Sequence, residues 1–242
     1  MHHLSPGAGE ADVVRRDEVI DAEEGAALSE AARQRSQTYS WMSDLFLGAP
    51  DEAGIASFRE RAAEASGSAE DFAFKNRLGE IATALENVTP AALAVEHARL
   101  FAGLGESYGP AAPYESMHAG IPVHGDSIPN MVDAYRAAGF DRIDVPAVPQ
   151  DHLAVELRFM ALLAAQECAA WNERDIELTR ALLTRQRTFL DDHLLAWVPA
   201  YCEKVAAEAC EPFFAAFARL TAEALARDRE NVDDLLREAA PV

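Results

Sequence analysis

Large apolar residues recur at spacings of three and four along almost the whole chain after residue 28, and this pattern constrains the fold more than any other feature. Such spacing places side chains on one face of an α-helix, whereas the strict alternation of a β-strand is essentially absent. The sequence therefore predicts an all-α fold, with one helical domain of about ten helices over residues 29–240. The clearest stripes are Tyr39, Met42 and Phe46; Leu153, Leu157, Met160 and Ala164; and Phe213, Phe217, Leu220 and Ala224.

A stretch rich in glycine and proline interrupts the helical pattern between residues 103 and 130. It contains Gly103, Gly105, Gly109, Pro110, Pro113, Gly120, Pro122, Gly125 and Pro129. Irregular connections of this length are uncommon inside domains and are usually functional or linking segments. We therefore expect a hinge loop over about 103–130 between two helical halves of the domain.

The charge balance limits which partners the chain can bind. Of its 242 residues, 41 are acidic and 21 are Lys or Arg, which gives a net charge of −20 at pH 7. Nucleic acid and anionic membrane surfaces are therefore excluded as main partners, because both attract clustered basic residues. No apolar run approaches the roughly 20 residues that a membrane-spanning helix needs, so we expect no membrane insertion.

Residues 1–28 are acidic and poor in large apolar side chains, so we expect them to form a disordered tail. Arg15 and Arg16 lie in this tail, but the acidic stretch after them excludes a twin-arginine export signal, which needs an apolar segment there. The three cysteines of the chain have neither zinc-type nor disulfide-framework spacing. Together these observations predict a cytoplasmic protein.

The segment Pro149-Gln150-Asp151-His152 lies at the expected start of a long helix and has two interpretations. The first is a capped helix with one surface histidine, because a carboxylate such as Asp151 is favoured near a helix N-terminus. The second is a polar recognition corner beside the hinge loop. In that corner Asp151 accepts hydrogen bonds from a guanidinium, and Glu156, one turn on, pairs with His152.

Patterns for catalysis or for a bound cofactor are weak or absent. Residues 103–109 lack the spacing and the preceding strand of a dinucleotide loop, and the sequence contains no P-loop. The seven histidines form no metal-type pair, and Asp191-Asp192-His193 is better explained as a solvated helix face with His193 near Trp197. Ser116 lacks the setting of a serine nucleophile. We therefore expect a protein that is not an enzyme and has no metal or cofactor of its own.

Five segments of the chain, taken together, resemble a known family. In order along the chain they are Leu100-Phe101-x-Gly103, Pro113-Tyr114-Glu115-Ser116, Met131-x-x-x-Tyr135-x-x-x-Gly139, Pro149-x-Asp151-His152-Leu153-x-x-Glu156-Leu157-x-Phe159-Met160 and Phe189-Leu190-x-x-His193-Leu194-x-x-Trp197. They are similar to the TorD/DmsD family of cytoplasmic chaperones for molybdoenzymes, also called redox enzyme maturation proteins. The resemblance runs from about residue 35 to 228.

This resemblance implies an all-helical fold and a chaperone without enzymatic activity. Family members bind the twin-arginine signal peptide of a DMSO- or TMAO-reductase-type catalytic subunit. They hold that subunit back from export until its molybdopterin guanine dinucleotide cofactor is inserted. An apolar groove would take the hydrophobic part of the peptide. By resemblance, the residues that line the signal-peptide site are Asp151, His152, Pro149, Tyr114, Leu100 and Phe101.

Two departures from the family pattern concern the identity of the client enzyme. Relatives usually have acidic residues on both sides of the proline, where this chain has Val148 and Gln150, and we expect Glu115 and Glu156 to substitute for them in the signal-peptide site. His118 stands where relatives often have an aromatic residue. The nitrate-reductase chaperone branch usually lacks the Asp-His pair, which favours the TorD/DmsD branch.

Several alternatives stay open on the sequence alone. The chain is either a signal-peptide chaperone, a GTP-binding maturation factor, or an all-α interaction adaptor without signal-peptide specificity. Also open are the docking of cofactor-biosynthesis proteins and the choice between a monomer and a domain-swapped dimer.

Overall fold

The computed structural model describes residues 22–68, 72–86, 88–105, 108–118, 127–145 and 148–239. Within these residues the regular structure is helical, with one isolated β-bridge, so the predicted all-α fold is confirmed. None of the described helices is both long and apolar enough to cross a membrane. The helices are α1 (Ala22–Leu47), α2 (Glu52–Ser68), α3 (Phe72–Ala84), α4 (Pro90–Phe101), α5 (Glu115–His118), α6 (Ser127–Ala137), α7 (Leu153–Glu173), α8 (Ile176–Phe189), α9 (Leu195–Glu208) and α10 (Pro212–Glu238), and a π-helical turn, η1 (Leu190–Leu194), joins α8 to α9.

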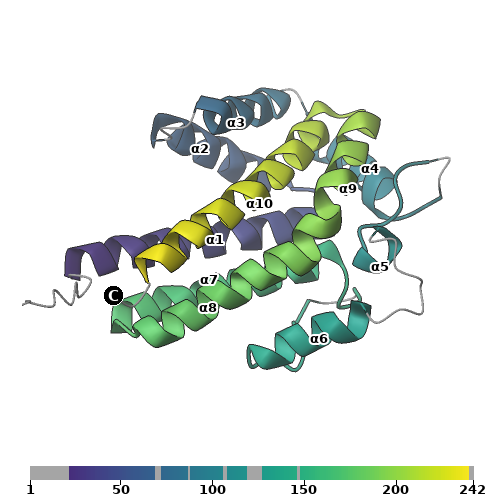
Figure 1. Ribbon diagram of the computed structural model, residues 1–242. Helices are drawn as coiled ribbons and strands as arrows, with labels where there is room; N and C mark the ends of the chain where they lie inside the picture. Colours follow the sequence, from purple (N-terminus) through teal and green to yellow (C-terminus); the bar gives the residue numbers. More distant parts are fainter. Residues whose placement is uncertain are drawn as a thin grey trace, which may run out of the picture.

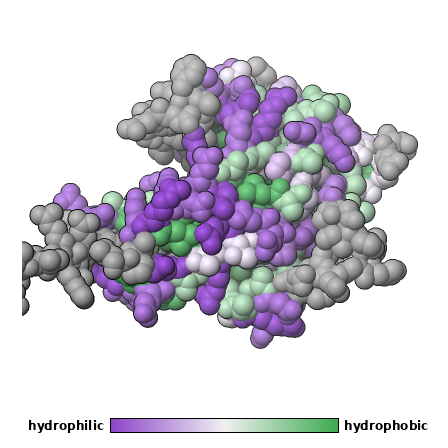
Figure 2. Space-filling view, in the orientation of Figure 1, coloured by the Kyte–Doolittle hydropathy of each residue, from purple (hydrophilic) through white to green (hydrophobic). Residues whose placement is uncertain are grey.

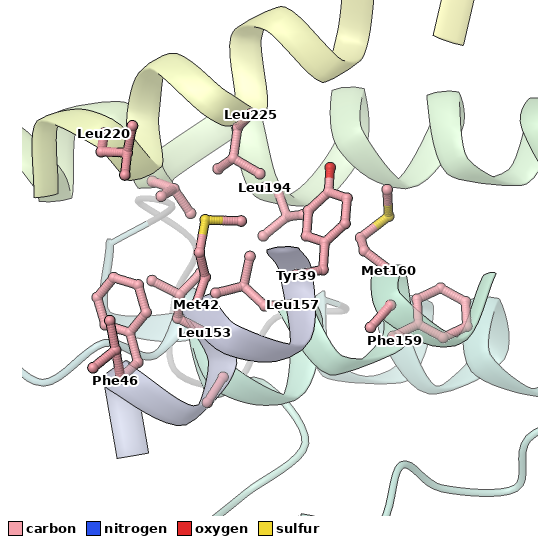
Figure 3. Close-up of a cluster of buried hydrophobic side chains, with 14 of the residues drawn as sticks. Tyr39, Met42, Phe46, Leu153, Leu157, Phe159, Met160, Leu194, Leu220 and Leu225 are labelled. Carbon is pink, nitrogen blue, oxygen red and sulfur yellow. The ribbon is translucent and has the colours of Figure 1, made fainter. Parts of the chain in front are cut away.

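The long helices α1, α7, α8 and α10 form the body of the molecule, and the short helix α5 lies at one end of it (Figure 1). The apolar stripes predicted for α1 and α7 face each other in this body. Figure 3 shows Met42 of α1 lying between Leu153 and Leu157 of α7 on one side and Leu225 of α10 on the other. All four side chains are buried. The periodicity therefore predicted the core faces of these helices correctly.

Two predicted boundaries differ from the structure. Helix α1 begins at Ala22, inside the stretch predicted to be a disordered tail, and residues 1–21 of that tail lie outside the described residues. Alanine and glutamate are good helix formers, and Glu23 and Glu24 favour the first turn of a helix, which explains the earlier start. The predicted loop at 103–130 also contains α5 and the first residues of α6, while residues 106–107 and 119–126 lie outside the described part.

The start of this connection is held against α4. A Cβ atom on Gly109 would lie only 2.2 Å from the carbonyl oxygen of Arg99, so the two backbones approach too closely for any larger residue. Arg99 also donates a hydrogen bond from Nη1 to the carbonyl oxygen of Tyr108 (3.0 Å). Just before this point, Gly103 has a φ of +65°, which favours glycine. A hinge function for the connection stays a prediction.

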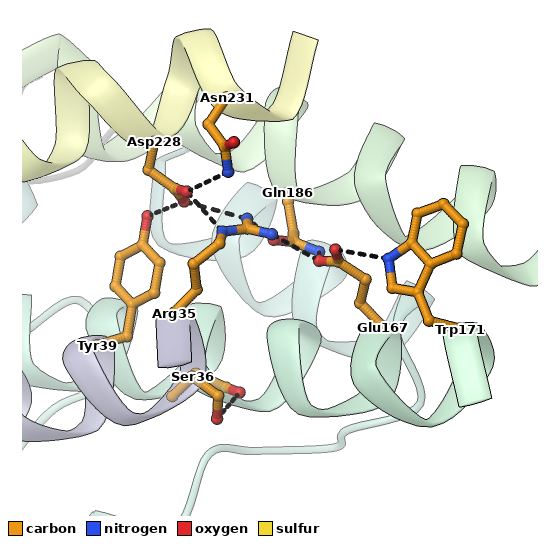
Figure 4. Close-up of polar contacts among 9 residues, drawn as sticks. Arg35, Ser36, Tyr39, Glu167, Trp171, Gln186, Asp228 and Asn231 are labelled. Atoms are coloured by element: carbon orange, nitrogen blue, oxygen red, sulfur yellow. Dashed lines mark hydrogen bonds and ion pairs between the residues drawn. The ribbon is translucent and has the colours of Figure 1, made fainter. Parts of the chain in front are cut away.

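A buried ion-pair network ties the four long helices together (Figure 4). Arg35 of α1 donates from Nε to Asp228 Oδ1 of α10 (2.6 Å) and from Nη1 to Glu167 Oε2 of α7 (2.8 Å). It also donates to the side chain of Gln186 on α8, and the Tyr39 hydroxyl donates to Asp228 (2.7 Å). Burial by itself lowers the pKa of Arg35, but Asp228 and Glu167 outweigh this effect, so the net pKa is raised and the guanidinium stays charged.

We expect Arg35→Ala to lower the free energy of unfolding by about 3–5 kcal/mol, because Asp228 and Glu167 would stay buried without a cation. Arg33 lies on the same helix but pairs with Glu30 in solvent, so Arg33→Ala is the matched control and should have a far smaller effect. Urea unfolding followed by circular dichroism measures both variants. Similar losses for the two would contradict a central role for the network.

Candidate functional site

The predicted corner forms where the segment before α5 meets the segment before α7. Tyr114 and His152 form an isolated antiparallel β-bridge. The Glu115 N–H donates to the carbonyl oxygen of Asp151, and the Leu153 N–H donates to the carbonyl oxygen of Pro113, both at 2.9 Å. The structure therefore brings together two segments that both carry the family resemblance and lie far apart in the chain.

His152 is buried and acts as the N-cap of α7. Its Nδ1 accepts a hydrogen bond from the Ala154 N–H (3.1 Å), and its ring meets the Tyr114 ring edge-on at 5.2 Å between centroids. Burial lowers the pKa of His152 to about 4, although the nearby Asp151 acts in the opposite direction. The imidazole is therefore neutral at pH 7. The interpretation as a surface histidine is wrong, and so is the expected pairing with Glu156, because neither carboxyl oxygen of Glu156 forms a hydrogen bond with the ring.

Asp151 is buried as well, with 4% of its surface exposed. The hydroxyl of Ser116 on α5 donates to its Oδ2 (2.6 Å). Gln150, at a position where the family resemblance implies an acidic residue, exchanges two hydrogen bonds with the backbone of Ile143, at 2.8 and 3.1 Å. Gln150 therefore holds the connection between α6 and α7 and supplies no charge. Pro149 lies on the surface beside it.

Glu115 of α5 pairs with His193, which was predicted to lie near Trp197 on a helix face that is otherwise solvated; Asp191 and Asp192 are indeed exposed, but His193 is not. His193 lies in η1 and is buried, with its Nδ1 3.1 Å from Glu115 Oε2 and 3.2 Å from Oε1. The π-helical turn changes which side chains point inward there, and helical periodicity does not signal such a change. On the same helix α5, His118 stacks on Trp197 of α9, with ring centroids 5.2 Å apart and planes 9° from parallel.

Glu156 lies on the inner side of α7 and is fully buried. Burial raises the pKa of its carboxyl well above the usual range, and the carboxyl groups of Glu115 and Asp151 raise it further. The neighbouring Trp197 indole N–H lies close to the carboxyl and lowers this pKa, but its effect is smaller than that of burial. These surroundings therefore favour the neutral, protonated form of Glu156.

Leu100 and Phe101 do not line an open groove, which corrects the prediction from the family resemblance. Both belong to the hydrophobic core, and Phe101 packs against Phe46 of α1 and Phe214 of α10, with ring centroids 5.4 and 5.7 Å apart. Large apolar side chains that are exposed nearby in the chain are Leu104, Tyr108 and Met117.

The described surface also contains a pocket of about 680 Å³ between α3 and the start of α10. It is lined by Gly79, Glu80, Thr83, Ala84, Val88, Glu211, Pro212, Ala215, Ala216 and Arg219. None of these residues belongs to the corner. No group of three or more metal-ligating side chains occurs within the described ranges.

We expect His152→Asn to reduce the loss of stability in acid, because asparagine still caps a helix but has no ring that titrates. The folded pKa of about 4 lies below the ordinary value of 6.5, so stability is lost as the pH falls from about 6.5 towards 4. Between pH 7 and pH 5 the wild-type protein should lose about 2 kcal/mol more than the variant. Urea unfolding at both pH values measures this difference, and parallel losses would contradict a buried neutral ring.

Comparison with known proteins places the chain in a family. A family model described as "Nitrate reductase delta subunit" matches residues 69–203, which is more than half of the chain. Chaperone protein TorD of Vibrio cholerae serotype O1 (strain M66-2) is 28% identical over 214 residues, covering 85% of this chain and 94% of the relative. Chaperone protein TorD of Photobacterium profundum is 40% identical over 72 residues, or 30% of this chain and 32% of the relative. The chain therefore belongs to the nitrate reductase delta subunit family, as a TorD-like member.

Proposed function

We propose that this protein is a cytoplasmic chaperone for the maturation of a molybdoenzyme, without enzymatic activity of its own. In this proposal it binds the twin-arginine signal peptide of a DMSO- or TMAO-reductase-type catalytic subunit. It assists cofactor insertion and delays export until the subunit is mature. Membership of the family and the curated relatives named Chaperone protein TorD support this function.

The observation that carries the proposal is the contact between the Tyr114 segment and the Asp151-His152 segment. A helix start needs one cap, and His152 supplies it. Capping alone does not explain why a second, distant segment pairs with the same residues and brings Ser116 to Asp151 and Glu115 to His193. A specific recognition corner explains both contacts.

The surface around α5 suits a peptide with a basic and an apolar part. Tyr108 and Met117, on either side of the corner segment, are 65% and 58% exposed, which is high for large apolar side chains. They replace Leu100 and Phe101 as the proposed contacts for the hydrophobic part of the peptide. The net charge of −20 favours the approach of the basic part, because complementary charge raises association rates.

We expect the combined variant Tyr108→Ser and Met117→Ser to weaken peptide binding about tenfold or more. Two apolar side chains that the peptide would cover in the complex are then lost. The probe is a synthetic peptide with an Arg-Arg pair followed by an apolar segment, and isothermal titration calorimetry measures the dissociation constant. Leu178 on α8 is also exposed and apolar, so Leu178→Ser is the matched control and should leave binding unchanged.

Two outcomes would contradict the proposed function. The first is that the wild-type protein does not bind the Arg-Arg peptide. The second is that it binds a scrambled peptide of the same composition equally well, which is the result expected for an interaction adaptor without signal-peptide specificity.

A further inference from the structure

Several buried polar atoms beneath α5 make no hydrogen bond of normal geometry among the described residues, although the Trp197 indole lies close enough to Glu156 to lower its pKa. They are both carboxyl oxygens of Glu156, the indole nitrogen of Trp197 and the hydroxyl of Tyr201. The three residues are at most 2% exposed, and the rings of Trp197 and Tyr201 lie 5.6 Å apart. Protein interiors satisfy the great majority of buried polar atoms, so a cluster of unsatisfied atoms indicates a missing partner.

The charge around Glu156 indicates what kind of partner is missing. Glu115 and Asp151 both act electrostatically on the Glu156 carboxyl, so three acids converge on one buried region. The hydrogen-bond partner of Glu115 is the His193 imidazole, and that of Asp151 is the Ser116 hydroxyl. Within the described ranges no lysine or arginine forms an ion pair with any of the three acids.

The Arg35 network shows how the same protein satisfies buried acids when it supplies the cation itself. There one guanidinium lies between the carboxylates of Asp228 and Glu167 and reaches both. The region around Glu156 has the acids and the neighbouring aromatic rings but lacks the guanidinium. A guanidinium also prefers to stack on an aromatic face, and the face of Trp197 is covered by the parallel ring of His118.

We propose that the Glu156 carboxyl accepts an arginine side chain of the client signal peptide, and that α5 covers this site in the free protein. This inference rests on the proposed function and names the group that recognises the arginine. In this arrangement the peptide displaces α5 from the corner. The incoming guanidinium then takes the place of His118 against Trp197 and reaches Glu156.

The contacts of α5 are consistent with a removable cover. It is a single turn of four residues, held by the Glu115 N–H bond to the Asp151 carbonyl and by side chains to three elements: Ser116 to the segment before α7, Glu115 to η1, and His118 to α9. Each contact is a hydrogen bond or a ring stack, and the exposed Met117 lies on the same turn. A short element with few buried apolar contacts belongs to the less stable part of a fold.

This proposal predicts release of a proton when the peptide binds. In the free protein the burial of Glu156 and the neighbouring acids favour its protonated form, because both raise its pKa, whereas a bound guanidinium favours the ionised carboxylate and the proton then leaves for the buffer. The other titratable groups around the site are Glu115, Asp151, His118, His152, His193, Tyr135 and Tyr201. A variant without the Glu156 carboxyl separates the protons that Glu156 releases from those that the other groups release or take up.

We expect Glu156→Gln to weaken binding of the Arg-Arg peptide at least tenfold and to abolish proton release. Calorimetry in buffers of different ionisation enthalpy measures both quantities. Glutamine is similar in size and resembles the protonated acid that the buried surroundings favour, so the fold should survive, and circular dichroism checks this. Glu177→Gln on the surface of α8 is the matched control and should keep wild-type affinity and proton release.

A second measurement tests the cover without changing Glu156. Tyr114 and His152 form a narrow antiparallel pair, because their neighbours make the flanking hydrogen bonds, and such a pair suits a disulfide. In a Cys210→Ser background, the variant Tyr114→Cys with His152→Cys should bind the Arg-Arg peptide at least tenfold more weakly when oxidised than when reduced. The two redox states of one chain serve as each other's control.

The possible failures are distinguishable. If the wild-type protein does not bind the Arg-Arg peptide, the proposed function fails and this inference fails with it. If the wild-type protein binds but releases no proton, or Glu156→Gln binds as tightly as wild type, only the inference is overturned. Equal affinities of the oxidised and reduced double-cysteine variant would contradict the role of α5 as a cover.

Discussion

The pairing of Arg35 with two acids is the interaction on which the rest of the structure depends. A guanidinium buried among four helices is tolerated only if carboxylates meet it in the correct geometry. Asp228 and Glu167 meet it from α10 and α7, and Gln186 extends the network to α8. Because each contact requires a fixed register between two helices, the network specifies how α1, α7, α8 and α10 lie against one another. Apolar stripes alone would allow these helices to slide by a turn.

The two ends of α7 use buried acids in opposite ways. Near its C-terminal end Glu167 is fully paired, because it accepts hydrogen bonds from Arg35, Gln186 and the Trp171 indole. Near its N-terminal end Glu156 makes no hydrogen bond of normal geometry among the described residues. A rigid body next to an unsatisfied region is typical of proteins that bind a ligand, because local rules of stability are broken at functional sites. The helices joined by the Arg35 network hold the corner in position. Their stability offsets the free-energy cost of leaving the buried polar atoms around Glu156 unsatisfied.

The sequence predicted those features of the fold that depend on the local pattern of residues. The stripes of α1, α7 and α10 identified the core faces, and Asp151 with His152 marked the start of α7. Contacts between distant residues were not predictable, because one sequence does not show which polar groups meet. Arg35 and Asp228 are 193 positions apart, and no local signal connects them. His193 was misplaced because the π-helical turn shifts the inward face. Phe101 was assigned to a groove by resemblance, although a stripe of helical spacing is most simply a core face, as the structure shows.

Burial of the recognition group has a consequence for specificity. A chain with a net charge of −20 attracts any basic segment, and acids on its surface would bind many of them with little discrimination. The proposed acid beneath α5 is different, because a ligand reaches it only when another part of that ligand supplies the free energy to displace α5.

The exposed side chains of Tyr108 and Met117 can supply this free energy through apolar contact with the ligand. A ligand then needs a basic group and an apolar stretch in the correct order, and neither alone is sufficient. A desolvated carboxyl also distinguishes a planar, weakly hydrated guanidinium from an ammonium group more strongly than a solvated one does. In the proposed mechanism this arrangement would select for the combination of a basic pair and an apolar stretch that defines a twin-arginine leader.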